Sequence, residues 1–293
     1  MNPVMQQARR FEELLDREPQ DGPYVFSTIF DNRTWQAHRR SKLKFRLLQA
    51  IDAKLQAMLQ PGERVRYVTL GCGVSFWESY LLGWIVYFLN RRAIIVTSRR
   101  ILLLQIGSRN QPRELVAQLR YSAIARVSST LLGYTKLHLV NGNTYVFAHV
   151  PKADRRFLQS LVKWTGKRMG QDHADIEHLC SHCFALIAGQ PERCASCGGT
   201  FKSSLRATLL SLAFPGFGDW YLGHRVFAVF EIIAAALLWA FVLLPYLQHT
   251  LSLSMRLVFA GLIVLFAHGA DAVKTRHIAR KGLYPDRTRS ADG

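Results

Sequence analysis

The distribution of apolar residues divides the chain into a mixed N-terminal part and a strongly apolar C-terminal part. Residues 226–247 form an apolar run in which Glu231 is the only charged residue, and residues 251–270 form a second run with Arg256 near its start. At about 1.5 Å per residue, a helix over either run approaches the roughly 30 Å thickness of a hydrocarbon core. A short turn at residues 245–250 separates the runs. We therefore predict an antiparallel hairpin of transmembrane helices, although two buried helices of a soluble domain would show a similar pattern.

The mixed part contains short apolar and β-branched runs that predict antiparallel strands. Asn141-Gly142 lies between two such runs and is a strong hairpin signal. A helix over residues 152–169 follows, with most of its apolar side chains on one face. Several antiparallel strands followed by one helix are consistent with a small β-barrel. The expected strands cover residues 63–70, 93–97, 101–106, 121–127, 137–140 and 144–150.

Two further helices are predicted before the first strand. Residues 4–17 carry apolar side chains along one side, whereas residues 35–59 begin with a basic stretch and become amphipathic. The basic stretch is either a solvated helix face or a surface that attracts anionic lipid headgroups, at about 1 kcal/mol per base near the membrane. Pro61 and Gly62 end this helix before the first strand.

Residues 74–90 interrupt the strand pattern with an aromatic segment. Its large aromatic residues recur at helical spacing, and Arg91 and Arg92 follow them. We prefer a helix that dips into the lipid interface, where Trp and Tyr are enriched. A stripe packed in the protein core and a full membrane crossing are the alternatives. The residues assigned to the interface in this segment are Trp77, Tyr80, Trp84 and Tyr87.

Four of the five cysteines form a recognisable metal-binding pattern. Cys180 and Cys183 form one Cys-x-x-Cys pair, and Cys194 and Cys197 form a second pair ten residues later. This spacing predicts one Zn²⁺ held by four thiolates, a site that is structural rather than catalytic. The alternatives are cysteines that pair only by chance and a redox dithiol, but a redox pair usually occurs singly, near a βαβ pattern. Cys72 remains as a small buried residue, and the few cysteines indicate a reducing compartment.

The formal net charge of +18 is distributed unevenly. Basic residues predominate up to Lys202 and again in residues 273–293, whereas residues 226–272 carry one base and two acids. Positively charged segments tend to stay on the cytoplasmic side of a membrane. Residues 1–19 contain no apolar stretch that would serve as a cleaved secretory signal. We therefore expect both termini to lie in the cytosol.

The segment Phe214–Gly223 reads Phe-Pro-Gly-Phe-Gly-Asp-Trp-Tyr-Leu-Gly and resembles the Pro-Gly-x-Gly-x-x-Tyr-x-Gly signature of TM2-type membrane domains. The resemblance implies a short apolar helix, this turn and a following transmembrane helix. The family often has an acid that closes its last helix, and Asp271 is the matching residue here. It has no common catalytic activity, so only topology and membrane residence are implied. Trp220 and Tyr221 are assigned to the headgroup interface, which both residue types favour.

Residues 61–168 resemble the bacterial PH-like, GRAM-type domains. The matching pieces are a first strand, Val96–Leu102, the Tyr121-x-x-Ile124-x-x-Val127 region, the Asn-Gly hairpin and the closing helix, in this order. The resemblance implies a small antiparallel barrel with a C-terminal helix. Many relatives bind lipids or peptides close to a membrane. The sequence shows no lipid-specific signature, so the resemblance names no ligand.

Glu231 and Asp271 are the acidic residues of the apolar region and are candidate intramembrane polar residues. Glu231 lies about one and a half helical turns inside the first run. In an antiparallel hairpin it would come near Asp271 or His268. An acid inside a membrane is a functional hypothesis by default. The alternative is an interfacial acid that the headgroup region hydrates.

Together these patterns predict an α+β chain: a PH-like small antiparallel β-barrel with a C-terminal helix, a zinc ribbon and a helical transmembrane hairpin. We expect it to reside in the bacterial cytoplasmic (inner) membrane as a multi-pass protein. The expected segments are a helical N-terminal part at 1–60, a PH-like domain at 61–170 with the aromatic insertion at 74–90, a zinc ribbon at 176–202, a TM2-like module at 204–272 and a basic cytoplasmic tail at 273–293.

The sequence shows no recognisable catalytic motif. It lacks a Gly-rich phosphate loop with a following Lys, a Gly-x-Ser-x-Gly elbow and a His-Glu-x-x-His pattern, so no catalytic or cofactor-binding residue is assigned apart from the zinc ligands. We expect a membrane-proximal binding or scaffolding protein rather than an enzyme. Membrane lipids are the preferred partner, a protein partner comes second and nucleic acid third. The alternatives are a nucleic-acid-binding zinc-ribbon protein tethered to the membrane, or an accessory subunit of a transporter or envelope enzyme.

Overall fold

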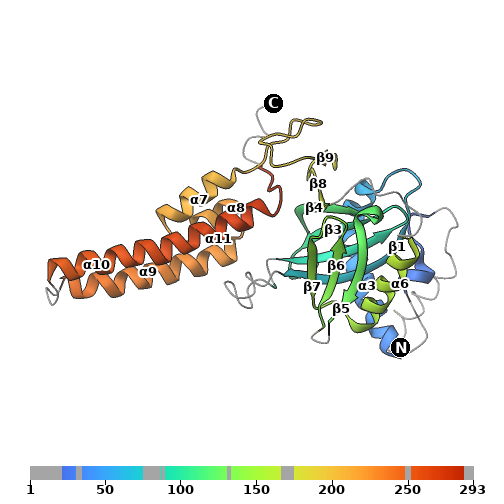
Figure 1. The fold of residues 1–293 in the computed structure, drawn as a ribbon, viewed down its shortest axis with the longest axis horizontal. Helices are drawn as coiled ribbons and strands as arrows, with labels where there is room; N and C mark the ends of the chain where they lie inside the picture. Colours follow the sequence, from blue (N-terminus) through green and yellow to red (C-terminus); the bar gives the residue numbers. More distant parts are fainter. Residues whose placement is uncertain are drawn as a thin grey trace, which may run out of the picture. The chain divides into compact units, whose positions relative to one another are not determined.

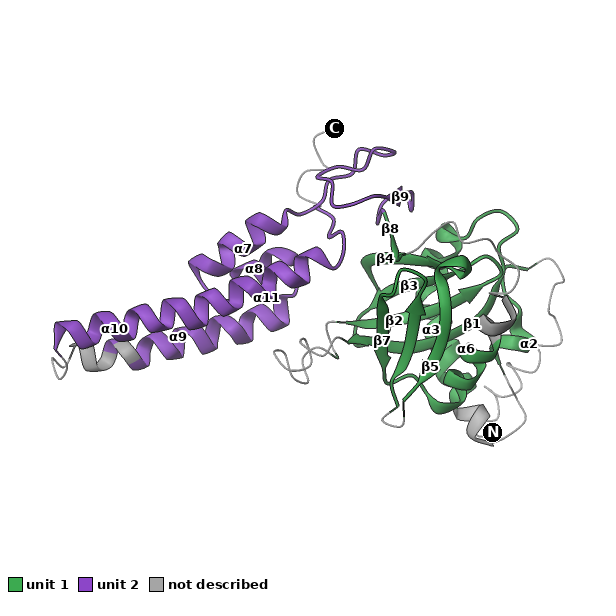
Figure 2. Cartoon of the chain, viewed as in Figure 1, with its two compact units in different colours: residues 1–179 green, residues 180–293 purple. Residues whose placement is uncertain are grey.

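The chain folds into two compact units, Met1–Leu179 and Cys180–Gly293 (Figure 2). The computed structural model describes residues 22–30, 35–74, 87, 90–130, 133–165, 175–247 and 252–286. The helix expected at residues 4–17 therefore lies outside the described residues, as do Trp77, Tyr80 and Trp84 of the aromatic insertion.

An antiparallel sheet forms the body of the first unit (Figure 1). Within this unit the strand order is β5-β6-β7-β1-β2-β3-β4-β8, and a further strand, β9 (Leu186–Ile187), belongs to the second unit. The other strands are β1 (Val65–Val74), β2 (Arg91–Thr97), β3 (Arg100–Ile106), β4 (Pro112–Arg120), β5 (Ile124–Ser129), β6 (Thr135–Leu139), β7 (Thr144–Ala148) and β8 (Glu177–Leu179).

The sheet is open, which corrects the expectation of a closed barrel. The outer edge of β4 pairs with β8, with Val116 opposite Leu179 and Gln118 opposite Glu177. A strand edge that already has a partner cannot also pair with β5 to close a barrel. Residues 177–179, which the sequence analysis assigned to the zinc ribbon, are thus part of the sheet.

The central strands are buried on both faces. Ile94, Val96 and Ile101 belong to a core cluster that also contains Leu158 of α6 (Lys152–Thr165). Their neighbours Ile95 and Leu102 are equally buried, and successive side chains of a strand point to opposite faces. The long helix α3 (Trp35–Met58) contacts β1 and β4 and buries its own apolar side chains, among them Leu47, Ile51 and Leu55. Because both faces of these strands are buried, the strands are continuous apolar runs and do not alternate between apolar and polar residues.

Local turn chemistry explains the hairpin between β6 and β7. Asn141-Gly142 forms the turn, and Gly142 has a φ of 85° that favours glycine. The hairpin predicted from these two residues is thus confirmed, with Leu137 opposite Tyr145. Two short helical segments, α2 (Phe26–Ile29) and η2 (Tyr121–Ala123), complete the first unit.

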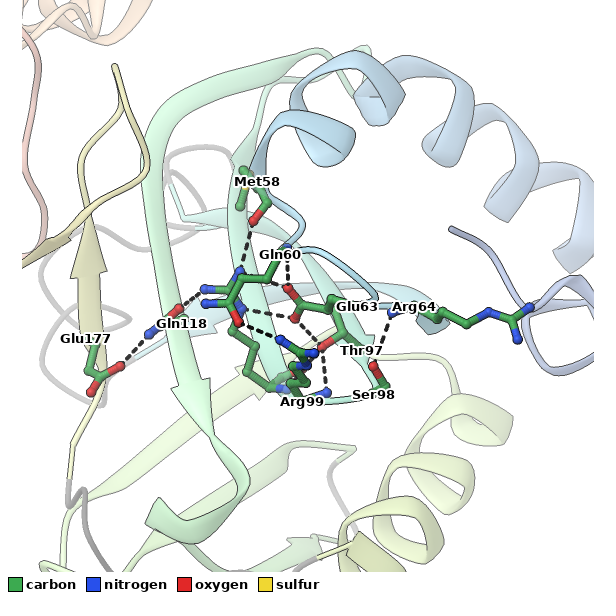
Figure 3. A network of polar contacts seen from close by, with 10 residues as sticks. Met58, Gln60, Glu63, Arg64, Thr97, Ser98, Arg99, Gln118 and Glu177 are labelled. Carbon is green, nitrogen blue, oxygen red and sulfur yellow. Dashed lines mark hydrogen bonds and ion pairs between the residues drawn. The ribbon is translucent and has the colours of Figure 1, made fainter. Parts of the chain in front are cut away.

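A buried ion pair holds the turn between β2 and β3 in place. Arg100 donates from Nε to Oε1 of Glu63 at 3.0 Å and from Nη2 to Oε2 at 2.9 Å. The two residues are only 6% and 3% exposed. Arg100 also donates to the Met58 carbonyl and to the amide oxygen of Gln118, and Glu63 also accepts from the Gln60 N–H and the Thr97 hydroxyl. The amide nitrogen of Gln118 in turn donates to Glu177 (Figure 3). The network ties the end of α3 to β2, β3, β4 and β8.

Helices make up most of the second unit. They are α7 (Ser204–Ala213), α8 (Phe217–Leu222), α9 (Arg225–Leu247), α10 (Leu253–Ile263), the π-helical segment η4 (Val264–His268) and α11 (Gly269–Arg280). The last three run on as one continuous helix, and α9 lies alongside α10 (Figure 1). Ser203 caps α7 by accepting the N–H of Arg206 at 3.4 Å.

Among the described residues, one helix is long and apolar enough to cross a membrane: the continuous helix Leu253–Arg280. The multi-pass topology expected from two apolar runs is therefore not supported. The first run also forms a helix, α9, which carries Arg225 and Glu231 in its first two turns. Glu231 forms an ion pair inside the protein.

Candidate metal centre and buried charge cluster

The two Cys-x-x-Cys pairs lie in two turns of the same backbone geometry. The N–H of Cys180 donates to the Ala185 carbonyl at 2.9 Å, and the N–H of Phe184 donates to the Cys180 carbonyl at 3.0 Å. Cys194 makes the equivalent two bonds, at 2.8 and 2.9 Å, with a glycine at each partner position. The residue after the second cysteine has a positive φ in both turns, 59° at Phe184 and 71° at Gly198. Each turn therefore presents two thiols on the same side.

The four sulfur atoms converge on one point. The Sγ atoms of Cys180 and Cys197 are 3.8 Å apart, as are those of Cys183 and Cys194, and all four lie within 4.8 Å of one another. A tetrahedral metal with bonds of about 2.3 Å to sulfur separates its ligands by about 3.8 Å. The cluster can therefore hold a metal ion, as the sequence analysis predicted.

The environments of the thiols differ. Burial raises the pKa of Cys180 to about 12. Burial also opposes ionisation of Cys194, but the N–H groups of Cys197 and Ser196 and the neighbouring sulfurs outweigh it, so the pKa of Cys194 falls to about 7. Because metal binding requires thiolates, a cation at the centre would stabilise the ionised form of Cys180, which burial otherwise disfavours.

A small apolar cluster surrounds the cysteines. It consists of Cys180, Cys194, Ile187, Phe201 and Leu283. Leu283 comes from the segment after α11, and this segment pairs with the chain beyond the second turn: the N–H of Lys202 donates to the Tyr284 carbonyl at 2.7 Å. Residues 281–286, which the sequence analysis assigned to a basic tail, thus belong to the folded cysteine module, while residues 287–293 lie outside the described residues.

His182 packs beside the metal centre. Its backbone N–H points at the Cys180 sulfur at 3.4 Å, and its ring lies so close to Gly199 that a Cβ at residue 199 would meet the ring at 2.6 Å. A side chain at residue 199 would therefore displace the His182 ring from this contact.

A second cluster of chemically active groups surrounds Lys274 of α11. Its Nζ lies 3.0 Å from Asp219 Oδ2 and 2.5 Å from Asp271 Oδ1, and it also forms an ion pair with Glu231 Oε1. Asp219 is fully buried and Asp271 is 8% exposed. The cluster joins α8, α9 and α11, and it places Glu231 beside Asp271, a neighbour that the sequence analysis proposed for it.

The Pro-Gly-Phe-Gly turn positions this cluster. Gly216 has a φ of 90°, and its N–H donates to Asp271 Oδ2 at 3.0 Å. Gly218 lies against two other helices: a Cβ there would come within 2.3 Å of the Ala207 carbonyl oxygen and 2.7 Å of the Thr275 side chain. Glycine at residue 216 is needed for conformation, whereas glycine at residue 218 is needed for close helix packing.

We expect Gly218→Ala to destabilise the helical unit by about 1–3 kcal/mol, because the added methyl group overpacks the contact with α7 and α11. Thermal unfolding of the purified full-length protein measures the effect. Gly261→Ala is the matched control, since a Cβ at Gly261 has no neighbour within 4 Å and alanine is favoured over glycine in a helix by about 1 kcal/mol. Equal unfolding temperatures for the two variants would contradict this assignment.

His268, in the π-helical segment, is hydrogen-bonded through both ring nitrogens. Its Nδ1 lies 2.9 Å from the Leu212 carbonyl oxygen and therefore donates, and its Nε2 accepts from Trp239 Nε1 at 3.1 Å. These partners assign a neutral imidazole. His268 thus connects α7, α9 and the continuous helix as a structural residue.

The remaining predicted interface residues have varied surroundings. Trp220 is 51% exposed. The ring of Tyr221 has Lys202 Nζ and the Arg206 guanidinium each 5.4 Å from its centroid. The ring of Tyr87 lies edge-on to that of His149, with centroids 4.6 Å apart.

Sequence reasoning missed Lys274, the residue at the centre of the second cluster. It was counted only as one base of the C-terminal tail, although it lies three residues after Asp271 and hence on the same helix face. A base at that spacing from an acid, at the end of an apolar run, is a signal that could have found it.

Comparison with known proteins gives no match from which a function could be inferred, so the functional assignment rests on the residues of this chain. No protein-family model matches the sequence, and a search of curated proteins finds no significant match.

Proposed function

We propose that this protein is a membrane-anchored binding or scaffolding protein, with a cytosolic PH-like domain and a zinc ribbon. The observation that carries the proposal is the apolar surface of the helices in the second unit. Val226, Phe230 and Phe241 of α9 are 75%, 68% and 74% exposed, and Leu265 and Phe266 of the continuous helix are each 66% exposed.

Such a surface is costly in water. Burying a large apolar side chain is worth about 1.5–3 kcal/mol, and soluble monomers rarely expose contiguous apolar patches larger than a few hundred Å². Exposed apolar side chains recur along α9 and α10, with Leu237, Leu257, Val258 and Leu262 among them. Lipid is the solvent that such helices require. We therefore propose that the continuous helix and α9 enter the bilayer together, with both termini in the cytosol.

The chemistry of the four-cysteine centre favours zinc. Four thiolates in tetrahedral arrangement suit Zn²⁺ or an iron–sulfur cluster. Two short Cys-x-x-Cys turns that fill all four positions of one ion are typical of a structural zinc ribbon. In this role the metal would stabilise the module and leave no open coordination position for catalysis.

The strand order of the first unit supports a PH-like assignment. Strands β1 to β7 form one antiparallel sheet in the order β5-β6-β7-β1-β2-β3-β4, and the helix α6 follows β7 and packs on β5. In the second unit, the glycine turn between α7 and α8 with an acid on the last helix supports the TM2-like assignment. The ligand class that goes with this reading is a membrane lipid, with a protein partner as the alternative occupant.

Membrane insertion is tested by alkaline carbonate extraction of cell membranes. We expect the full-length chain to remain in the pellet and to be released by detergent. An arginine in the middle of a transmembrane helix costs about 2.5–3.5 kcal/mol on insertion, so Phe241→Arg should shift part of the protein to the soluble fraction. Leu186→Arg is the control, because Leu186 is also exposed, at 51%, but lies in the cysteine module. Recovery of the wild-type protein in the carbonate supernatant would contradict the proposed membrane insertion.

Lipid binding is tested with full-length protein in nanodiscs of phosphatidylcholine. Vesicles of phosphatidylcholine and phosphatidylserine are added, and sedimentation is measured as DNA and salt are titrated in. We expect association with the vesicles to persist in the presence of DNA. If DNA displaces the protein from the vesicles, the nucleic-acid-binding alternative is favoured. If the protein binds neither vesicles nor DNA, a protein partner is indicated.

A further inference from the structure

The charge cluster around Lys274 contains more negative than positive charge. An ammonium group has three N–H donors, and the three carboxylates of Asp219, Glu231 and Asp271 each supply one oxygen to it. The donors of Lys274 are therefore fully used. With all groups ionised, three negative charges face one positive charge, a surplus of two negative charges.

Two oxygen atoms of the cluster lack a partner. The second oxygen of Asp271 accepts the N–H of Gly216. The second oxygens of Asp219 and Glu231 are buried and have no hydrogen-bond partner among the described residues. Asp219 is fully buried, so its second oxygen is shielded from bulk solvent. A buried carboxylate oxygen without a partner is strongly unfavourable unless a cation or a proton neutralises it.

We propose that Asp219 and Glu231 bind one small divalent cation through these outer oxygens, beside Lys274. The inference does not depend on the function proposed above. One carboxylate oxygen of each of Asp219, Glu231 and Asp271 lies within 4.8 Å of the other two, so the three carboxylates are held together around Lys274. The charge of a divalent cation equals the surplus of the cluster. Each of the two carboxylates then contacts Lys274 with one oxygen and the cation with the other.

The donor atoms indicate the class of cation. Carboxylate oxygens are hard ligands that suit Mg²⁺, Ca²⁺ and Mn²⁺, whereas the thiolates of the cysteine centre suit softer metals. The two sites would therefore select different ions. Two protein ligands leave several coordination positions for water, which is common for Mg²⁺.

The test uses full-length protein in detergent with its cysteine centre saturated with Zn²⁺. Mn²⁺ is titrated in, and the free ion is measured by electron paramagnetic resonance. We expect one saturable Mn²⁺ per chain, displaced by Mg²⁺ or Ca²⁺. Asp219→Asn and Glu231→Gln each remove one anionic ligand and should weaken binding at least about tenfold. Glu192→Gln, at an exposed carboxylate outside the cluster, should leave binding unchanged.

Lys274→Met separates a cation site from a purely structural ion-pair cluster. Without the ammonium group the surplus rises to three negative charges, so Mn²⁺ should bind at least as tightly as in the wild type. Retained Zn²⁺ and a cooperative thermal transition show that each variant is folded. If Asp219→Asn does not fold, Glu231→Gln alone provides the test of the cation site. Two results would overturn the proposal: no saturable Mn²⁺ binding by the wild type, which would mean that protons neutralise the cluster, or wild-type affinity in folded Glu231→Gln.

Discussion

Cys194→Ser is expected to abolish metal binding at the four-cysteine centre and to unfold the module around it. The apolar cluster of this module has only five members, two of which are cysteines. A core of that size cannot offset the conformational entropy of the chain that it orders. In zinc-finger peptides, metal binding supplies an apparent 10–16 kcal/mol or so of folding free energy. Loss of one thiolate ligand therefore removes most of what holds residues 180–202 together.

Metal content and hydrogen exchange measure this effect together. We expect about one thiolate-bound metal, Zn²⁺ on the proposed assignment, per wild-type chain and little of it in Cys194→Ser. In the variant we also expect fast exchange of the backbone amides of Cys180, Phe184 and Gly198, which close the turns. Cys72→Ser is the matched control, because Cys72 is a buried cysteine of the first unit and should leave the metal in place. Acid should release the metal from the wild type, since protons compete for the thiolates. Full metal content in Cys194→Ser would refute the four-ligand assignment.

Glu63→Gln is expected to destabilise the first unit by about 3–5 kcal/mol. Removal of one partner of a buried ion pair leaves the other charge uncompensated, and Arg100 is only 6% exposed. The change is best measured by urea unfolding of the full-length protein in detergent. The double variant Glu63→Gln/Arg100→Met should be more stable than the single variant, because it removes the unpaired charge. Arg120→Gln, which breaks an ion pair at a 43% exposed side chain, should cost less than about 1 kcal/mol.

The same ion pair predicts a dependence of stability on pH. Burial alone would raise the pKa of Glu63, but hydrogen bonds from Arg100, the Gln60 N–H and Thr97 outweigh it, and the pKa is lowered. A carboxyl group whose pKa is lower in the folded state stabilises the fold above its unfolded pKa of about 4.3. That contribution is lost as the pH falls through the folded pKa. Glu63→Gln should therefore flatten the acid limb of the stability profile, and an unchanged acid limb would contradict this account.

Sequence patterns predicted those elements in which the conformational preference of the residues matches the backbone conformation in the structure. Asn141-Gly142 gave the hairpin between β6 and β7, and the uninterrupted apolar runs gave β2 and β3. Strand β4 was missed because Arg113, Glu114 and Gln118 break the apolar pattern. Gln118 is nevertheless buried, since the network around Arg100 and Glu177 satisfies its amide. A buried polar residue with distant partners cannot be distinguished from a surface residue by sequence pattern.

The cysteine spacing alone predicted the four-cysteine cluster that can hold a metal ion, and the apolar runs alone predicted that the C-terminal part is helical, because both depend on neighbours within a few residues. Tertiary structure alone decided three other features. The sheet is open because β8 pairs with β4, residues 281–286 pack on the cysteine module, and three acidic residues surround Lys274. Each of these depends on contacts between segments far apart in the chain, which are set by packing rather than by local preference.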